Sequence, residues 1–123
     1  MTAGALRGLF CILGLALSGA ADAADRLPNA MFGKWTTDLA ACSEQSSEIV
    51  VTVEARSVLF YEHGYEIRQV TRLKDGTLKA SGFSVDLDGR TRGSIQLKLL
   101  PDDRLRIGSE IYQRCKRKDG QAQ

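Results

Sequence analysis

The stretch from Tyr65 to Leu100 constrains the fold most, because apolar and polar residues alternate there in three long segments that two Asp-Gly pairs separate. Asp75-Gly76 and Asp88-Gly89 favour two-residue hairpin turns of type I′, in which both central residues adopt positive φ. Two consecutive hairpins make a meander, so the middle of the chain is predicted to be antiparallel sheet. The three strands are expected at residues 65–73, 78–87 and 90–100.

Shorter segments with the same period of two flank this meander. His63-Gly64 predicts a further hairpin turn. Eight antiparallel strands with short connections predict an all-β fold, a small eight-stranded antiparallel meander barrel, because closure removes exposed strand edges. An open sheet or a two-sheet sandwich with the same strand order is the alternative. The five additional strands are expected at residues 32–36, 49–54, 58–61, 105–107 and 111–115.

The alternation changes phase inside the predicted strand at residues 78–87. Leu78 belongs to one face of this strand, whereas Phe83 and Val85 belong to the other. A β-bulge inserts one residue and reverses the facing of every side chain after it. A bulge at Ser81-Gly82 would therefore turn all three side chains inward.

The first 23 residues predict a secretory signal peptide, with Arg7 before an apolar run at residues 8–17 and small residues up to Ala23. The apolar run is shorter than the roughly 20 residues that span a bilayer. No cysteine stands where bacterial lipid anchoring requires one. We therefore expect cleavage after Ala23 and a soluble mature chain that is periplasmic or secreted.

Cleavage removes Arg7 and Asp22, which leaves 16 basic and 14 acidic residues and a net charge of +2. A mature chain of about one hundred residues forms a single domain with a modest core. The expected segments are a flexible N-terminal arm at residues 24–30, a β-barrel domain at residues 31–115 and a disordered C-terminal tail at residues 116–123.

The cysteines predict a covalent link across this domain. Cys11 leaves with the signal peptide, so Cys42 and Cys115 remain in an oxidising compartment. We predict that they form a disulfide, which contributes about 4 kcal/mol in the chain-entropy model. Two free thiols or a metal site are the alternatives, although two cysteines and one distant histidine fall short of the four ligands of structural zinc. Asp38 is expected to cap one short helical turn at residues 39–42.

The sequence offers little for catalysis. Its single histidine, His63, lies in a predicted hairpin tip and not beside a nucleophile that it could activate. Glu62 and Glu66 are the neighbours that could join it at a metal, although strand alternation does not guarantee that the three side chains converge. We expect no catalytic residue, no metal site and no cofactor.

A basic stripe on the outer faces of neighbouring strands could attract phosphorylated glycolipid, nucleic acid or an acidic protein face. Solvated outer faces also carry such charges, and acidic residues interrupt this one. No aromatic residue alternates with the basic ones as a stacking platform requires, so nucleic acid is not an expected partner. The stripe comprises Arg68, Arg72, Arg90, Arg92, Lys98, Arg104 and Arg106.

Aromatic residues gather around the predicted turn at His63-Gly64, which Phe60, Tyr61 and Tyr65 flank. Exposed aromatic side chains at a rim are typical of protein contact surfaces. Tyr61, His63 and Tyr65 are therefore the candidate partner-binding residues. The alternative is that these rings fill the end of the barrel.

Gly33-Lys34-Trp35 at the start of an eight-stranded meander resembles the opening G-x-W of the lipocalin and calycin families. In those families an arginine near the end of the barrel packs over the tryptophan, and Arg114 matches that position. The resemblance implies a structural closure in which Trp35 and Arg114 form a cation–π contact, which contributes about 0.5–2 kcal/mol.

Small periplasmic barrels that inhibit secreted enzymes are similar in size. The bacterial metalloprotease inhibitors have a free amino-terminal arm, then a G-x-W-type strand, then a cysteine, and this resemblance implies that residues 24–27 enter a protease cleft. Residues 80–84 resemble the S-G-x-x-Y loop of the periplasmic lysozyme inhibitors, with Val85 in place of the tyrosine.

The leading hypothesis is an exported, monomeric, non-catalytic binding module that acts on a protein or envelope component through a loop end or its arm. An enzyme inhibitor is one form of it. The second hypothesis is a small-ligand carrier, which needs an interior pocket of roughly 300 Å³. A hydrolytic enzyme is the third. A pocket lined by Tyr65, Gln69 and Phe83 would favour the carrier, whereas a filled core with an exposed tip would favour protein binding.

Overall fold

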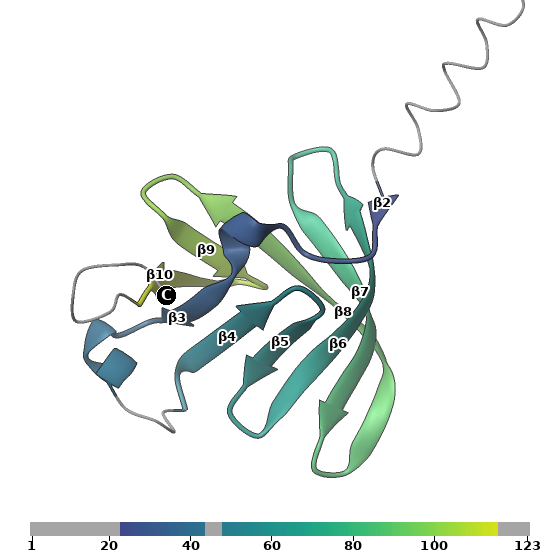
Figure 1. Ribbon diagram of the computed structural model, residues 1–123, viewed down its shortest axis with the longest axis horizontal. Coiled ribbons are helices and arrows are strands. Elements are labelled where there is room, and N and C mark those ends of the chain that lie inside the picture. The colour runs from purple at the N-terminus through teal and green to yellow at the C-terminus, as the bar shows by residue number, and fades with distance from the viewer. Residues whose placement is uncertain (1–22, 44–47, 116–123) are drawn as a thin grey trace, which may run out of the picture.

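The chain folds into a closed eight-stranded antiparallel barrel, which the computed structural model describes for residues 23–43 and 48–115 (Figure 1). Consecutive strands pair in meander order, and β10 pairs with β3 to close the sheet. The predicted barrel is therefore confirmed, and the open-sheet and sandwich alternatives are wrong. The barrel strands are β3 (Gly33–Thr36), β4 (Val50–Glu54), β5 (Ser57–Phe60), β6 (His63–Arg72), β7 (Leu78–Asp86), β8 (Gly89–Leu100), β9 (Arg104–Ile107) and β10 (Glu110–Arg114).

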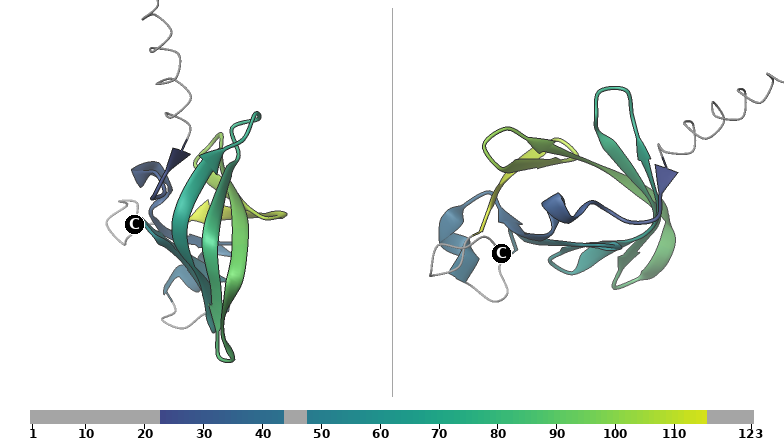
Figure 2. Two further views of the ribbon diagram at one scale, coloured as in Figure 1. Left: turned by 90° about the vertical axis from the view of Figure 1, so that its right-hand side faces the viewer. Right: turned by 45° about the horizontal axis from the view of Figure 1, so that its top comes forward.

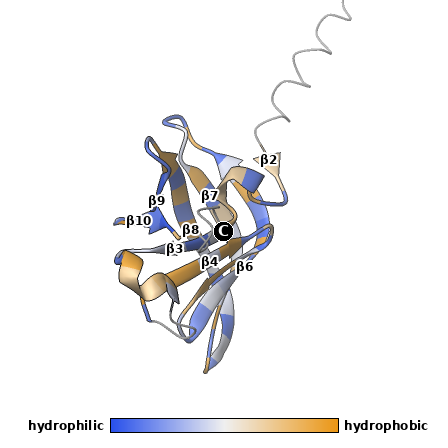
Figure 3. Cartoon of the chain, turned by 60° about the vertical axis from the view of Figure 1, so that its left-hand side comes forward, coloured by the Kyte–Doolittle hydropathy of each residue, from blue (hydrophilic) through white to orange (hydrophobic). Residues whose placement is uncertain are grey.

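Inward-pointing side chains fill the barrel, and apolar and polar bands alternate along its strands (Figure 3). Burial raises the pKa of Tyr112, with a smaller contribution from the charge of Glu110. The buried apolar cluster comprises Leu27, Met31, Trp35, Val51, Val53, Val58, Ile67, Val70, Leu78, Ala80, Leu97, Leu105, Ile107 and Tyr112.

In both predicted Asp-Gly turns only the glycine has positive φ, +90° at Gly76 and +130° at Gly89. The type I′ prediction is therefore wrong, because that turn needs positive φ at two adjacent residues. The carboxylate of Asp75 instead accepts a hydrogen bond from the N–H of Thr77 at 2.9 Å, which lowers the pKa of this carboxyl group. In this turn the side chain of Asp75 thus accepts a stabilising hydrogen bond, and Gly76 adopts the positive φ that the turn needs.

The turn between β5 and β6 lies two positions earlier than predicted. Phe60 pairs with His63, so the chain reverses at Tyr61 and Glu62, and Glu62 adopts a φ of +65°. The prediction of a turn at His63-Gly64 is wrong, since both residues belong to β6.

The β-bulge lies in β6 and not in β7. Ile67 pairs with Gly82, and Gln69 pairs with Ser81, which leaves Arg68 as the extra residue. The predicted bulge at Ser81-Gly82 is therefore placed on the wrong strand of the pair. The pairing of β7 with β8 runs without a register shift.

The position of the bulge in β6 reverses the predicted orientation of several side chains. Because β7 is regular, Ala80 faces the core with no exposed surface, whereas Phe83 and Val85 lie on the outer face. The bulge in β6 turns Val70 into the core and leaves Gln69 exposed. The expectation that Gln69 and Phe83 face inward is wrong.

The segment expected to be a free arm, residues 24–30, instead packs against one end of the barrel. Strand β2 (Ala23–Ala24) pairs with the end of β6. The N–H of Leu27 donates to the carbonyl of Ala55 at 2.8 Å, and its side chain is 1% exposed. The 3₁₀ turn η1 (Asn29–Met31) follows, and the segment lies across the barrel mouth (Figure 2). Leu27 is thus a core residue, unavailable to enter a protease cleft.

The predicted closure between Trp35 and Arg114 is present. The guanidinium carbon of Arg114 lies 4.2 Å from the Trp35 ring centre. Its nitrogens donate at 2.7 Å to the carbonyls of Ala30 and Phe32 and to the carboxylate of Asp103. One side chain therefore joins the last strand, the first strand and the segment across the mouth.

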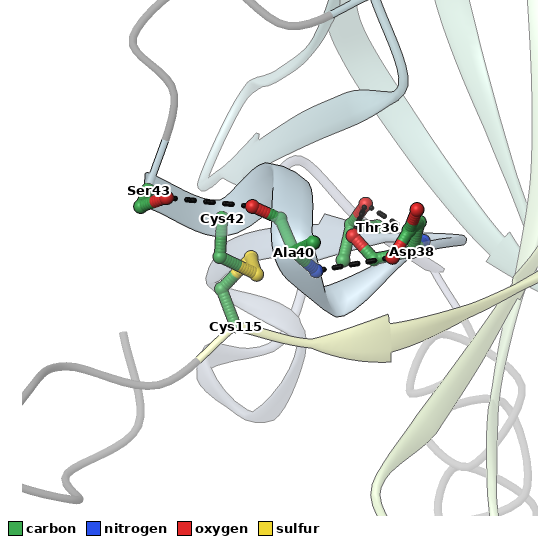
Figure 4. Close-up of a disulfide and its surroundings, with 6 residues drawn as sticks. All are labelled: Thr36, Asp38, Ala40, Cys42, Ser43 and Cys115. Atoms are coloured by element: carbon green, nitrogen blue, oxygen red, sulfur yellow. Dashed lines mark hydrogen bonds between the residues drawn. A yellow bond between two sulfur atoms is a disulfide. The ribbon is translucent and has the colours of Figure 1, made fainter.

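Cys42 and Cys115 form the predicted disulfide, which links the 3₁₀ turn η2 (Leu39–Ser43) to the residue after β10 (Figure 4). The carboxylate of Asp38 accepts from the N–H of Ala40 at 3.1 Å, so the predicted cap is confirmed. The two cysteines are 73 residues apart in sequence. Residues 1–22 of the predicted signal peptide and the predicted tail at 116–123 lie outside the described residues.

Gly82→Ala should destabilise the barrel, because a Cβ atom at this position would overlap the carbonyl oxygen of Glu66 on β6. Overpacking of this kind costs about 1–3 kcal/mol. Gly93→Ala is the matched control, since the nearest atom to its Cβ would be Ser84 Cβ, at 3.3 Å. Urea unfolding followed by circular dichroism compares the two. A Gly82→Ala protein no less stable than Gly93→Ala would contradict this assignment.

Arg114→Lys should lower the free energy of unfolding by about 1–3 kcal/mol, because an ammonium group cannot replace the three directed hydrogen bonds and the stacking of the guanidinium group. Trp35 is the single tryptophan, so its fluorescence reports thermal unfolding at the closure itself. Arg72→Lys on the exposed end of β6 is the control. Equal melting temperatures for the two variants would refute the role given to Arg114.

Candidate functional site

Of the three candidate partner-binding residues, His63 and Tyr65 line a common hollow, and Tyr61 lies outside its lining. Tyr61 lies in the turn between β5 and β6 and is 42% exposed. Tyr65 packs against the core, and its ring meets that of Phe60 edge to face at 6.3 Å. His63 stacks on the same ring, with its ring centre 4.6 Å from that of Phe60. Part of the aromatic set therefore fills the barrel end, as the alternative reading expected.

Within the described part of the chain, His63 contacts Phe60 and the backbone of Tyr61. Besides the ring of Phe60, its Nδ1 lies 3.3 Å from the carbonyl oxygen of Tyr61. Glu66, a predicted neighbour at a metal, instead binds Arg90 at 2.9 Å. Within residues 23–43 and 48–115, no three His, Cys, Asp or Glu side chains converge in a way that could hold a metal ion.

An exposed apolar surface lies beside these aromatic residues, on the outer faces of β5, β6 and β7. Leu59 pairs with Gly64, and Gly64 pairs with Val85, so the three residues form one row across the strands. Leu87 follows β7 and is 83% exposed, and Leu59 is 44% exposed. We call Leu59, Val85 and Leu87 the hairpin-tip patch.

Gly64 lets the Leu59 side chain lie close over β6. A Cβ atom at Gly64 would lie 3.1 Å from Leu59 Cδ2 and 2.9 Å from the carbonyl oxygen of Val58. The Leu59 side chain therefore lies over Gly64, and a hollow of about 360 Å³ has Leu59, Gly64 and Val85 in its lining. His63, Glu62 and Asp86 also line it, so an apolar floor has a polar border.

The sequence pattern missed this patch for a definite reason. Leu59 and Val85 lie on different strands, and only the register of β5, β6 and β7 brings them to either side of Gly64. The exposed run Val85-Asp86-Leu87 before a turn was the one available signal, since an apolar residue at a hairpin tip is unusual.

The carrier hypothesis needs an interior pocket lined by Tyr65, Gln69 and Phe83, and these three residues do not line one interior space. Only Tyr65 of these three residues points inward, since Gln69 is exposed and Phe83 lies outside. Trp35, Leu97 and Leu105 fill the centre with no exposed surface.

A larger hollow of about 750 Å³ lies outside the barrel, near the disulfide. Leu39, Cys42 and Gln113 line it together with Asp103 and Arg114. Asp102 and Arg104 line it too, so two acidic and two basic residues surround the hollow, and Asp103 binds Arg114 at 2.7 Å. The hollow therefore offers little uncompensated charge to a ligand.

Within the part of the chain that the structure describes, no helix is long and apolar enough to cross a membrane. Comparisons of the chain with protein-family models, with curated proteins and with solved structures gave no match.

Proposed function

We propose that this protein is an exported, non-catalytic binding module that captures a protein partner through the hairpin-tip patch. The observation that carries the proposal is the apolar hollow over Gly64, with exposed leucines on both hairpins that border it. An inhibitor of a secreted enzyme is one form of such a module.

The chemistry of the patch favours a protein over a small polar molecule. Leu59, Val85 and Leu87 supply apolar area that binding would remove from water. Glu62, His63 and Asp86 border it with groups that can hydrogen bond, which matches the apolar centre and polar rim of protein interfaces. A partner would insert an apolar side chain into the hollow and surround it with polar contacts.

The contacts of His63 support a non-catalytic role. Its ring lies flat on Phe60, and its Nδ1 lies 3.3 Å from a backbone carbonyl. Neither of these two contacts, made among the described residues, is with a nucleophile that His63 could activate. Cys42 and Cys115 are joined to each other and offer no thiolate.

Export rests on the signal-peptide pattern of the first 23 residues. The disulfide supports it, because such bonds persist mainly in oxidising compartments. A filled interior supports surface binding over the carrier alternative.

Leu87→Asp should abolish partner capture without unfolding the barrel, because the side chain is 83% exposed and a carboxylate there opposes burial against an apolar partner. Leu39→Asp on η2 is the matched control, since Leu39 is also exposed, at 53%, but lies outside the patch. The immobilised wild-type protein and both variants are compared by affinity capture from an extract of the native source, with quantitative mass spectrometry.

The expected result is a specific protein retained by the wild type and by Leu39→Asp and lost, by about tenfold or more, with Leu87→Asp. The circular dichroism spectra and melting temperatures of the three proteins should agree. If every protein captured by the wild type is equally retained by Leu87→Asp, the patch is not the binding surface.

A further inference from the structure

The outer face formed by β6, β7 and β8 carries an aromatic ring between two arginines. The guanidinium carbon of Arg90 lies 4.1 Å from the ring centre of Phe83, and that of Arg68 lies 5.5 Å from it. The expectation that no aromatic residue accompanies the basic stripe is wrong, because Phe83 faces outward. Contacts of this kind hold guanidinium groups in place over the ring.

Glu66 completes this arrangement. Its Oε1 accepts from Arg90 Nη2 at 2.9 Å and from Arg68 Nη2 at 3.5 Å. Two arginines on different strands are thus tied to one ring and one carboxylate. Because they are positioned before any ligand arrives, less side-chain entropy is lost on binding than with freely moving surface cations.

A hollow of about 480 Å³ opens beside this network. Arg68, Lys79 and Arg92 line it from β6, β7 and β8. Ser81 and Ser94, which are paired residues on β7 and β8, line it as well. Three cationic groups and two hydroxyl groups therefore surround one space, and each of them can donate hydrogen bonds.

The positive charge around this hollow is largely uncompensated. Neither Lys79 nor Arg92 has a salt bridge within the described part of the chain. Glu66 is the one carboxylate bound to the network, and Arg68 and Arg90 share it. An anion in the hollow would meet several cations without displacing an existing strong ion pair.

We propose that this hollow binds a phosphomonoester group. A phosphomonoester carries nearly two negative charges and three acceptor oxygens, which suit the three cations and two hydroxyls better than a singly charged planar carboxylate does. A nucleic-acid strand is less suitable, because its bases need free aromatic faces and Arg90 already lies over Phe83. This inference concerns a surface other than the hairpin-tip patch and does not depend on a protein partner.

The test is a titration of the ¹⁵N-labelled protein with methyl phosphate at pH 8, followed by amide chemical shifts. Methyl sulfate has the same tetrahedral shape with one charge less and serves as the matched probe. We expect saturable shifts around Ser81, Lys79 and Arg92, with methyl phosphate binding about five- to tenfold more tightly than methyl sulfate. Shifts spread evenly over the barrel, or equal affinity for the two probes, would overturn the proposal.

Lys79→Gln should weaken methyl phosphate binding by about fivefold or more, because it removes one cation that lines the hollow. Lys34→Gln makes the same chemical change on an exposed residue of β3, four strands from β7 in either direction around the barrel. It should alter the affinity by less than about twofold at 0.15 M salt, where distant charges are screened. Equal losses in the two variants would show a general charge effect and refute a built site.

A second arm separates the sources of the group. Flotation with vesicles of phosphatidylcholine, with and without phosphatidic acid, tests a lipid headgroup. Binding only to phosphatidic acid vesicles, reduced by Lys79→Gln and kept by Lys34→Gln, identifies a membrane source. Methyl phosphate binding without vesicle binding identifies a water-soluble phosphomonoester. Tighter binding of a thymidine oligonucleotide lacking terminal phosphates than of methyl phosphate would overturn the assignment.

Discussion

Arg114 joins three parts of the chain that a meander by itself leaves apart. Its guanidinium group stacks on Trp35 from the first barrel strand. It also donates to the carbonyl of Ala30, in the segment over the mouth, and to that of Phe32, which follows this segment. Trp35 in turn donates from Nε1 to the carbonyl of Met31 at 3.0 Å. Closure of the sheet and closure of the mouth are therefore coupled through one side chain. The filled core depends on both, since Leu27 of that segment is a core residue with 1% of its surface exposed.

The sequence was sufficient for strand positions, the barrel and the disulfide, because alternation and cysteine number report these features directly. It was insufficient where the position of a single residue determines the strand register or the turn. The alternation of apolar and polar residues did not decide which strand of the pair carries the extra residue. It changes phase at Ser81-Gly82 in β7, and these residues lie opposite the bulge at Arg68 in β6. The turn residue Glu62 gave no signal of its positive φ, since φ there is imposed by the pairing of Phe60 with His63. Both surface sites depend on register between strands, which no single segment encodes.

Two glycines give the outer surface its shape. Gly64 leaves room for the Leu59 side chain, and Gly82 lets β6 approach β7 at the bulge. The bulge places Arg68 near Phe83, so the cationic hollow depends on a backbone irregularity that a side chain at position 82 would oppose. An apolar and a cationic site thus occupy adjacent regions of the same three strands.

The bond between Cys42 and Cys115 encloses seven of the eight barrel strands, β4 to β10, in one covalent ring and leaves β3 outside it. A force applied to the two ends of the chain would be carried across the sulfur atoms and would bypass the enclosed strands. Such a pull would peel away only β2, η1, β3 and η2, and the remaining chain could not be drawn out to its contour length. The protein therefore resists extraction or threading from either terminus until this bond is reduced.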